Sequence, residues 1–170
     1  AHLENNTLYF EGFSKTHMLS MPALVGKHQI ENAGVAIACI EAIGAGSCST
    51  KSLNNGLQNV NWPGRLQRIT IPTSDIGWET FLDGGHNAGA GKALADAGIW
   101  DDKPLHLILG MINSKNPKEF LRPLASQITS ITGVKIPNES SSLSTQEICK
   151  AAQSLNIQAY HADSIENAIN

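Results

Sequence analysis

The spacing of apolar residues changes several times along the chain, and each change marks a different predicted element. Between residues 8 and 13 apolar side chains alternate with others as in a β-strand, and the pattern continues into Thr16–Met21 as a hairpin. From Gln29 to Ile43 the apolar residues lie three or four positions apart, which predicts an amphipathic helix. Thr50 is placed to cap a second, short helix that runs to about Asn59.

After the turn Trp62-Pro63-Gly64, strand-like and helix-like stretches alternate regularly. Ser144 and Glu147 form the sequence pattern of a capping box. Such alternation implies an α/β fold with a mostly parallel sheet and helices on both faces. We expect strands over Leu66–Pro72, Trp78–Asp83, Leu105–Leu109, Ile128–Ile136 and Ile157–Tyr160, and helices from Asn87 to about Gly98, from Asn116 to Gln127, from Ser144 to Leu155 and after Asp163, which caps the last one.

Composition and charge exclude several classes of function. The 170 residues carry a net charge of -3 and 16% charged residues, so no basic surface for nucleic acid is indicated. No apolar run approaches the roughly 20 residues of a membrane helix. Cys39, Cys48 and Cys149 form no CxxC pair, which predicts reduced thiols in a cytoplasmic protein and no metal site in this chain.

Three clusters of polar and charged residues stand where the chain changes direction. They are Gly26–Ala33, Trp62–Gln67 and Phe81–Asn87, the last reading Phe-Leu-Asp-Gly-Gly-His-Asn. Turns at strand ends are where α/β proteins usually place ligand chemistry. These clusters are therefore our candidates for the functional site.

A stretch from Gly85 to Ala93 has the outward form of a phosphate-binding loop, but its spacing is wrong. One residue too many separates the outer glycines, and Ala93 stands where a serine or threonine would hold magnesium. We therefore expect that this chain lacks a complete cradle for a triphosphate.

The order and spacing of the three clusters resemble folylpolyglutamate synthase, whose bacterial form is also a dihydrofolate synthase, within the Mur ligase superfamily. The segment Gly110–Asn116 is similar to the family's Gly-Met-x-x-x-Lys-Asp, with Asn116 in place of the acid. The resemblance covers Pro22 to about Asn170.

The resemblance implies an ATP-dependent amide ligase that adds glutamate to folate or dihydropteroate through an acyl phosphate. It implies that residues 1–61 are the tail of the family's ATPase domain and that residues 62–170 are its Rossmann-like C-terminal domain, truncated at its end. The phosphate loop and the Mg²⁺ ligands are expected in a preceding part, so the chain alone is expected to be inactive. The implied partners are ATP, L-glutamate and a folate or dihydropteroate, with no nucleic acid and no membrane.

The resemblance also assigns roles to individual residues. Asn32, Arg65 and Asp83 match positions that contact ATP, and an amide for a purine edge, a guanidinium for phosphate and a carboxylate for ribose suit those roles. From its place beside Asp83, we expect His86 to be oriented by that carboxylate and to be a catalytic residue that touches phosphate or the incoming glutamate.

Two further residues complete the predicted set. Lys115 is a second candidate for glutamate binding, and Asn87 is a helix cap close to the ligand.

Each assignment has a plain structural alternative. Asn32 can be a helix-surface amide, Arg65 a surface arginine paired with an acid, and Asp83 a strand terminator. Two other functions also stay open, namely a ligase of cell-wall precursors and a nucleotide-binding module without enzymatic activity.

Overall fold

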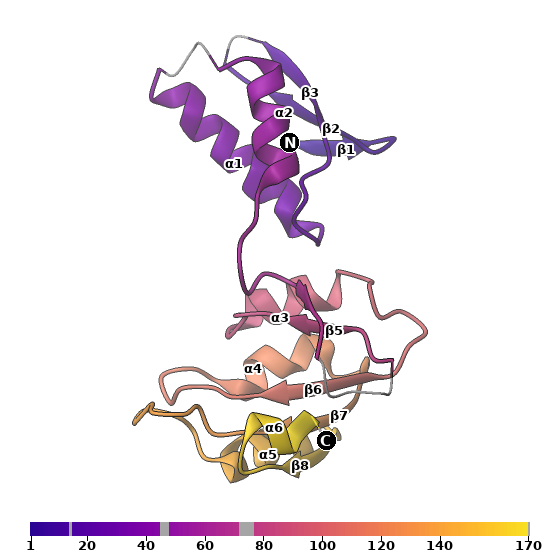
Figure 1. Cartoon of the computed structure of the whole chain (residues 1–170), viewed down its shortest axis with the longest axis vertical. Helices are drawn as coiled ribbons and strands as arrows, with labels where there is room; N and C mark the ends of the chain where they lie inside the picture. The colour runs from indigo at the N-terminus through magenta and orange to yellow at the C-terminus, as the bar shows by residue number, and fades with distance from the viewer. Residues whose placement is uncertain (14, 45–47, 72–76, 170) are drawn as a thin grey trace. The chain divides into compact units, whose positions relative to one another are not determined.

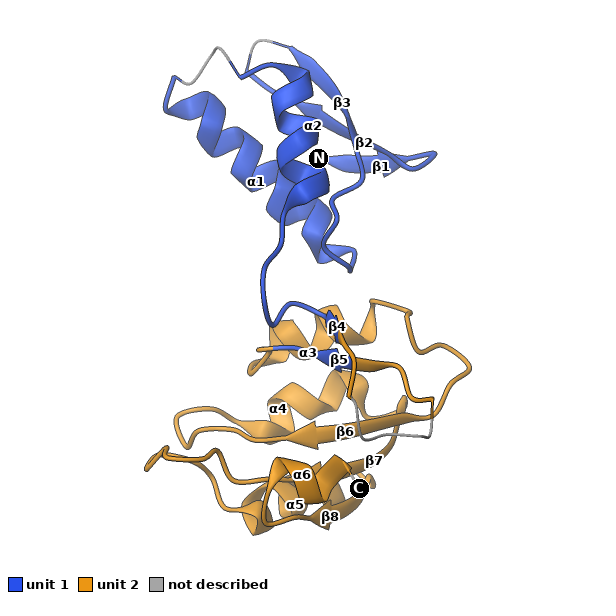
Figure 2. Cartoon of the chain, viewed as in Figure 1, with its two compact units in different colours: residues 1–68, 81–83 blue, residues 69–80, 84–170 orange. Residues whose placement is uncertain are grey.

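The computed structural model describes residues 1–13, 15–44, 48–71 and 77–169, and the chain divides into two compact units (Figure 2). Unit 1 comprises residues 1–68 and 81–83, and unit 2 comprises residues 69–80 and 84–170. This division reflects which residues of the chain contact one another, and it places the Trp62–Gln67 cluster in unit 1. The domain boundary at residue 62 stays a prediction.

Unit 1 combines an antiparallel sheet with two helices (Figure 1). The sheet contains β1 (His2–Glu4), β2 (Thr7–Glu11) and β3 (Thr16–Ser20), with β2 in the middle. The helices are α1 (His28–Ala42) and α2 (Thr50–Asn59). The predicted hairpin is confirmed, with Leu8 opposite Leu19 and Phe10 opposite His17.

The predicted cap of α2 was wrong by one residue. Ser49 has the extended backbone of an N-cap, and its hydroxyl oxygen accepts a hydrogen bond from the Ser52 N–H at 3.1 Å. Thr50 is instead the first helical residue. Either hydroxyl could have served, since serine and threonine are both good N-caps.

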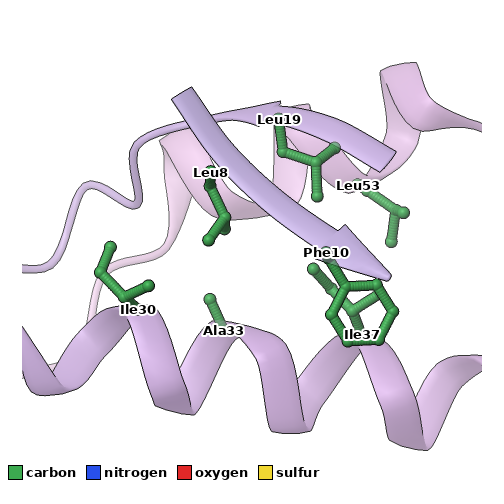
Figure 3. Packing of buried hydrophobic residues seen from close by; sticks show 7 residues of the cluster. All are labelled: Leu8, Phe10, Leu19, Ile30, Ala33, Ile37 and Leu53. Atoms are coloured by element: carbon green, nitrogen blue, oxygen red, sulfur yellow. The ribbon is translucent and has the colours of Figure 1, made fainter. Parts of the chain in front are cut away.

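The core of unit 1 lies between the sheet and the helices (Figure 3). Its apolar side chains come from alternate positions of β2 and from positions three or four apart on α1, which confirms the two spacings read from the sequence. The buried members are Leu8, Phe10, Leu19, Ile30, Ala33, Ile37 and Leu53.

Unit 2 contains the predicted parallel sheet. Strands β6 (Leu105–Leu109), β7 (Ile128–Gly133) and β8 (Gln158–His161) pair in parallel in the order β6-β7-β8. The helix α5 (Thr145–Gln153) lies between β7 and β8 in sequence. The predicted α/β fold class with a parallel sheet is thereby confirmed.

The two earlier predicted strands are shorter than expected. They appear as β4 (Gln67–Ile69) and β5 (Thr80–Leu82), which form a separate two-stranded sheet. The end of the first predicted strand, at Pro72, lies outside the described residues. Among the described residues, the parallel sheet therefore consists of the three later strands, β6, β7 and β8.

The helix predicted over residues 116–127 begins as expected and ends early. Pro117 opens α4 (Pro117–Leu121), and a 3₁₀ turn, η1 (Arg122–Leu124), follows. Pro123 has no N–H for the next helical hydrogen bond, and its ring disfavours continuation of the α-helix. The chain therefore tightens into a 3₁₀ turn at this point.

The capping box at α5 is confirmed. The Ser144 hydroxyl and N–H both donate to Glu147 Oε2, at 2.6 and 2.9 Å, and these bonds lower the pKa of the Glu147 carboxyl. The cap predicted for the last helix, α6 (Ile165–Ile169), was wrong. Ser164, not Asp163, precedes the helix and accepts from the Asn167 N–H at 3.2 Å.

Helix length and apolar character also bear on membrane association. Within the described ranges, every helix is too short or too polar to cross a bilayer.

Candidate functional site

Arg65 projects from a turn whose backbone is fixed on both sides. Gly64 and Leu66 have positive φ angles of 71° and 43°, a conformation that costs energy for leucine. The Gly64 N–H donates to Gln67 Oε1 at 3.0 Å, and the Leu66 N–H donates to Asp83 Oδ2 at 2.8 Å. Burial of Leu66 and these two hydrogen bonds offset the strain.

The side chain of Arg65 is exposed. Among the residues that the structure describes, none forms an ion pair or a hydrogen bond with its guanidinium, in contrast to the paired surface arginine considered above. An arginine on a rigid turn with a free fork of donors is suited to bind an anion such as phosphate.

Asp83 follows β5 directly and is half-buried. Its predicted place at the carboxyl end of a strand is confirmed. Because its carboxylate accepts from Leu66, Asp83 joins the third cluster to the Arg65 turn across 17 positions of sequence. A carboxylate has several lone pairs, so it can accept a further hydrogen bond from a ligand.

The ring of His86 is oriented by the main chain. Its Nδ1 lies 2.9 Å from the Gly84 carbonyl oxygen, so Nδ1 donates. In the neutral ring this leaves Nε2 with a lone pair, on an exposed side chain. We expected Asp83 to orient this ring; the contact that the structure shows is with Gly84.

Asn87 is the N-cap of α3 (Ala88–Ala95), as predicted. Its side-chain oxygen accepts from the Ala90 N–H at 2.9 Å. The three N–H groups at the start of a helix carry partial positive charge, which favours an anion nearby. His86 thus stands one residue before a capped helix N-terminus.

Lys115 lies in the turn that follows β6 and is half-buried. Its N–H donates to the Ile112 carbonyl at 3.1 Å, and Ile112 forms an antiparallel bridge with Ser142. The loop after β6 is therefore joined to the loop that follows β7. Like Asp83 and His86, Lys115 follows the carboxyl end of a strand, the usual ligand-binding edge of α/β sheets.

Asn32 lies on the exposed face of α1 and is not a free surface amide. Its Nδ2 donates to Gln29 Oε1 at 3.0 Å, and Gln29 Nε2 lies 2.8 Å from His28 Nε2. Gln29 is only 5% exposed. The sequence reasoning did not identify Gln29; its signal was a polar residue four positions before Ala33, on the core-facing side of the helix.

The structure therefore connects some of the predicted site residues and leaves others separate. Asp83 is bonded to the Arg65 turn, and His86 and Asn87 are neighbours at the start of α3. Asn32 belongs to a group of its own on α1, and Lys115 to the turn after β6. Over the described ranges, no group of three or more histidine, cysteine, aspartate or glutamate side chains is arranged to hold a metal ion.

Comparison with known proteins gives a consistent result. No family model matches the chain. It is 33% identical over 94 residues to a probable bifunctional folylpolyglutamate synthase/dihydropteroate synthase of Halobacterium salinarum, covering 55% of this chain and 11% of that protein. It is 25% identical over 123 residues to the dihydrofolate synthetase of Saccharomyces cerevisiae, covering 68% of this chain and 29% of that protein.

A solved structure shares the fold over almost the whole chain. Folylpolyglutamate synthase of Mycobacterium tuberculosis, complexed with ADP, aligns with a TM-score of 0.83 at 24% identity, covering 96% of this chain and 36% of that one. The chain thus spans between about a tenth and somewhat more than a third of the length of these proteins.

Proposed function

We propose that this chain is a member of the folylpolyglutamate synthase/dihydrofolate synthase family, to which it is similar, and part of an ATP-dependent ligase that adds L-glutamate to a folate or dihydropteroate. In this reaction the γ-phosphoryl group of ATP is transferred to a carboxylate of the acceptor. The amine of glutamate then attacks the acyl phosphate, an amide bond forms, and inorganic phosphate leaves. The observation that carries the proposal is the Arg65 turn bonded to Asp83 at the end of β5.

Three residues would hold the nucleotide. The exposed guanidinium of Arg65 would bind phosphate oxygens and neutralise charge that develops during transfer. Asp83 would accept a hydrogen bond from a ribose hydroxyl, as a carboxylate at the end of a strand can do. Asn32 would bind the edge of the purine with its amide.

The remaining site residues would serve the acceptor and the incoming amino acid. With Nδ1 bonded to Gly84, neutral His86 presents Nε2 as a hydrogen-bond acceptor, which can take a proton from the ammonium group of glutamate. Lys115 would attract the carboxylates of glutamate. Asn87 would keep α3 capped, so that its first N–H groups lie near an anionic ligand.

A divalent cation, which we propose is Mg²⁺, would accompany ATP. In the described residues no group of three or more histidine, cysteine, aspartate or glutamate side chains is arranged to hold a metal ion. From the family resemblance we propose that the ligands of this ion lie in another part of the ligase. Bound there, the ion would neutralise phosphate charge during transfer. The partners are small molecules, and the reduced thiols suit a cytoplasmic enzyme.

The first prediction concerns activity. In a full-length polypeptide that contains this chain, inorganic phosphate should be released from ATP only when glutamate and a folate or dihydropteroate are both present. The 170-residue chain alone should release none, because it contains no complete triphosphate cradle. A phosphate-release assay on both polypeptides, with each substrate omitted in turn, measures this.

Two outcomes would count against the proposal. Glutamate-dependent phosphate release by the 170-residue chain alone would show that the nucleotide cradle lies within it. A full-length polypeptide that is active with a cell-wall nucleotide precursor, and inactive with folate and dihydropteroate, would assign the chain to the other branch of the superfamily.

A further inference from the structure

The start of α1 carries a group of polar residues that the proposed reaction does not yet use. Gly26 precedes the helix with a φ angle of 112°, and the ring of His28 packs directly against it. A Cβ atom at position 26 would lie 2.6 Å from Cε1 of that ring. Glycine is thus required here both for the backbone conformation and for the room that His28 occupies.

His28, Gln29 and Asn32 form a continuous chain of hydrogen bonds. Asn32 Nδ2 donates to Gln29 Oε1 at 3.0 Å, so the other end of the Gln29 amide is its NH₂ group. That group lies 2.8 Å from His28 Nε2 and donates to it. An accepting Nε2 places the proton of a neutral His28 ring on Nδ1, which is buried without a partner among the described residues.

The direction of this chain determines what Asn32 presents to solvent. A side-chain amide that is free to turn can offer either its oxygen or its NH₂ group to a ligand. Here one N–H of Asn32 is held by Gln29, which is itself buried, so the amide keeps one orientation. Its oxygen and its second N–H remain available on the exposed face of α1.

We propose that His28 and Gln29 are positioning residues that select adenine as the base of the nucleotide. The inference rests on the proposed function, in which Asn32 binds the purine edge. An oxygen held outward accepts from the 6-amino group of adenine, and it repels the oxygen that hypoxanthine carries at the same position. Gln29 holds the Asn32 amide in this orientation, and His28 holds Gln29.

The experiment compares the affinities of the full-length polypeptide for ADP and for inosine diphosphate by titration calorimetry. The wild type should prefer ADP. Gln29→Met keeps the volume of the buried side chain and removes both hydrogen bonds, so the Asn32 amide can turn to suit either base. The preference for ADP should then fall by about tenfold, the equivalent of one ordinary hydrogen bond.

Two further variants separate positioning from general stability. Gln29→Glu fills the same buried position and keeps an oxygen that accepts from Asn32 Nδ2. This variant should therefore retain the preference for ADP. Gln58→Met makes the same exchange at an exposed position of α2 and should leave the ratio of affinities unchanged. If Gln29 had only a structural role, Gln29→Met would lower the affinities for ADP and inosine diphosphate together, and Gln29→Glu would not restore them.

The tautomer of His28 gives a readout that needs no nucleotide. In the 170-residue chain, ¹⁵N NMR should show the His28 proton on Nδ1, and Gln29→Glu, whose carboxylate can only accept, should move that proton to Nε2. A wild-type ring protonated only on Nε2 would overturn the direction of the hydrogen-bond chain. An unchanged ratio of affinities in a folded Gln29→Met variant would overturn the positioning role of Gln29 but not the proposed nucleotide site. A wild-type protein that binds no ADP would overturn both.

Discussion

Replacing Arg65 by alanine in the full-length ligase should lower kcat/KM for ATP by the equivalent of about 2–4 kcal/mol in transition-state stabilisation. The guanidinium is exposed on a turn whose backbone two hydrogen bonds to side chains hold in place, so the backbone that carries it is already ordered before phosphate binds. Steady-state kinetics with ATP as the varied substrate measures the effect.

Two variants show whether the loss belongs to this guanidinium. Arg65→Lys keeps the charge and loses the planar fork, and should recover only part of the activity. Arg122→Ala removes the same charge from an exposed position of η1 and should leave kcat/KM near the wild-type value. An Arg65→Ala enzyme with wild-type kcat/KM would mean that the Arg65 side chain takes no part in the reaction.

Features that depend on near neighbours were predictable from the sequence. The spacing of Ile30, Ala33 and Ile37 gave α1, and Asn87 was identified as a cap because asparagine before a helix satisfies its first N–H groups. Ser144 and Glu147 are three residues apart and form their capping box within one turn. The end of the strand before Asp83 followed in the same way, from an apolar run that meets an acid and two glycines.

Features that depend on distant contacts were not predictable. The hydrogen bond from Leu66 to Asp83 crosses 17 positions, and no local pattern shows it. Leu66 itself has a positive φ, which its residue type disfavours, so the turn is stable only in its tertiary setting. Gln29 was missed because its partners, rather than its type, determine what it does.

The two glycines of α3 should respond in opposite ways to alanine. A Cβ on Gly91 would lie 2.0 Å from the Phe120 carbonyl oxygen, far inside any real contact, so α3 and α4 would have to move apart. Gly91→Ala should lower the free energy of unfolding by about 2–3 kcal/mol, the upper part of the usual cost of overpacking. Chemical denaturation of the 170-residue chain, followed by circular dichroism, measures it.

Gly89→Ala is the matched control, since it makes the same exchange two residues earlier in the same helix. A Cβ there would come no closer than 3.4 Å to Asn87 Oδ1, and alanine favours a helix over glycine, so stability should be unchanged or higher by up to about 1 kcal/mol. Equal effects of the two variants would show that α3 does not pack on α4 as described. The opposite effects that we expect would explain the glycine in a sequence resembling a phosphate loop: Gly91 allows α3 to lie in close contact with the Phe120 carbonyl of α4.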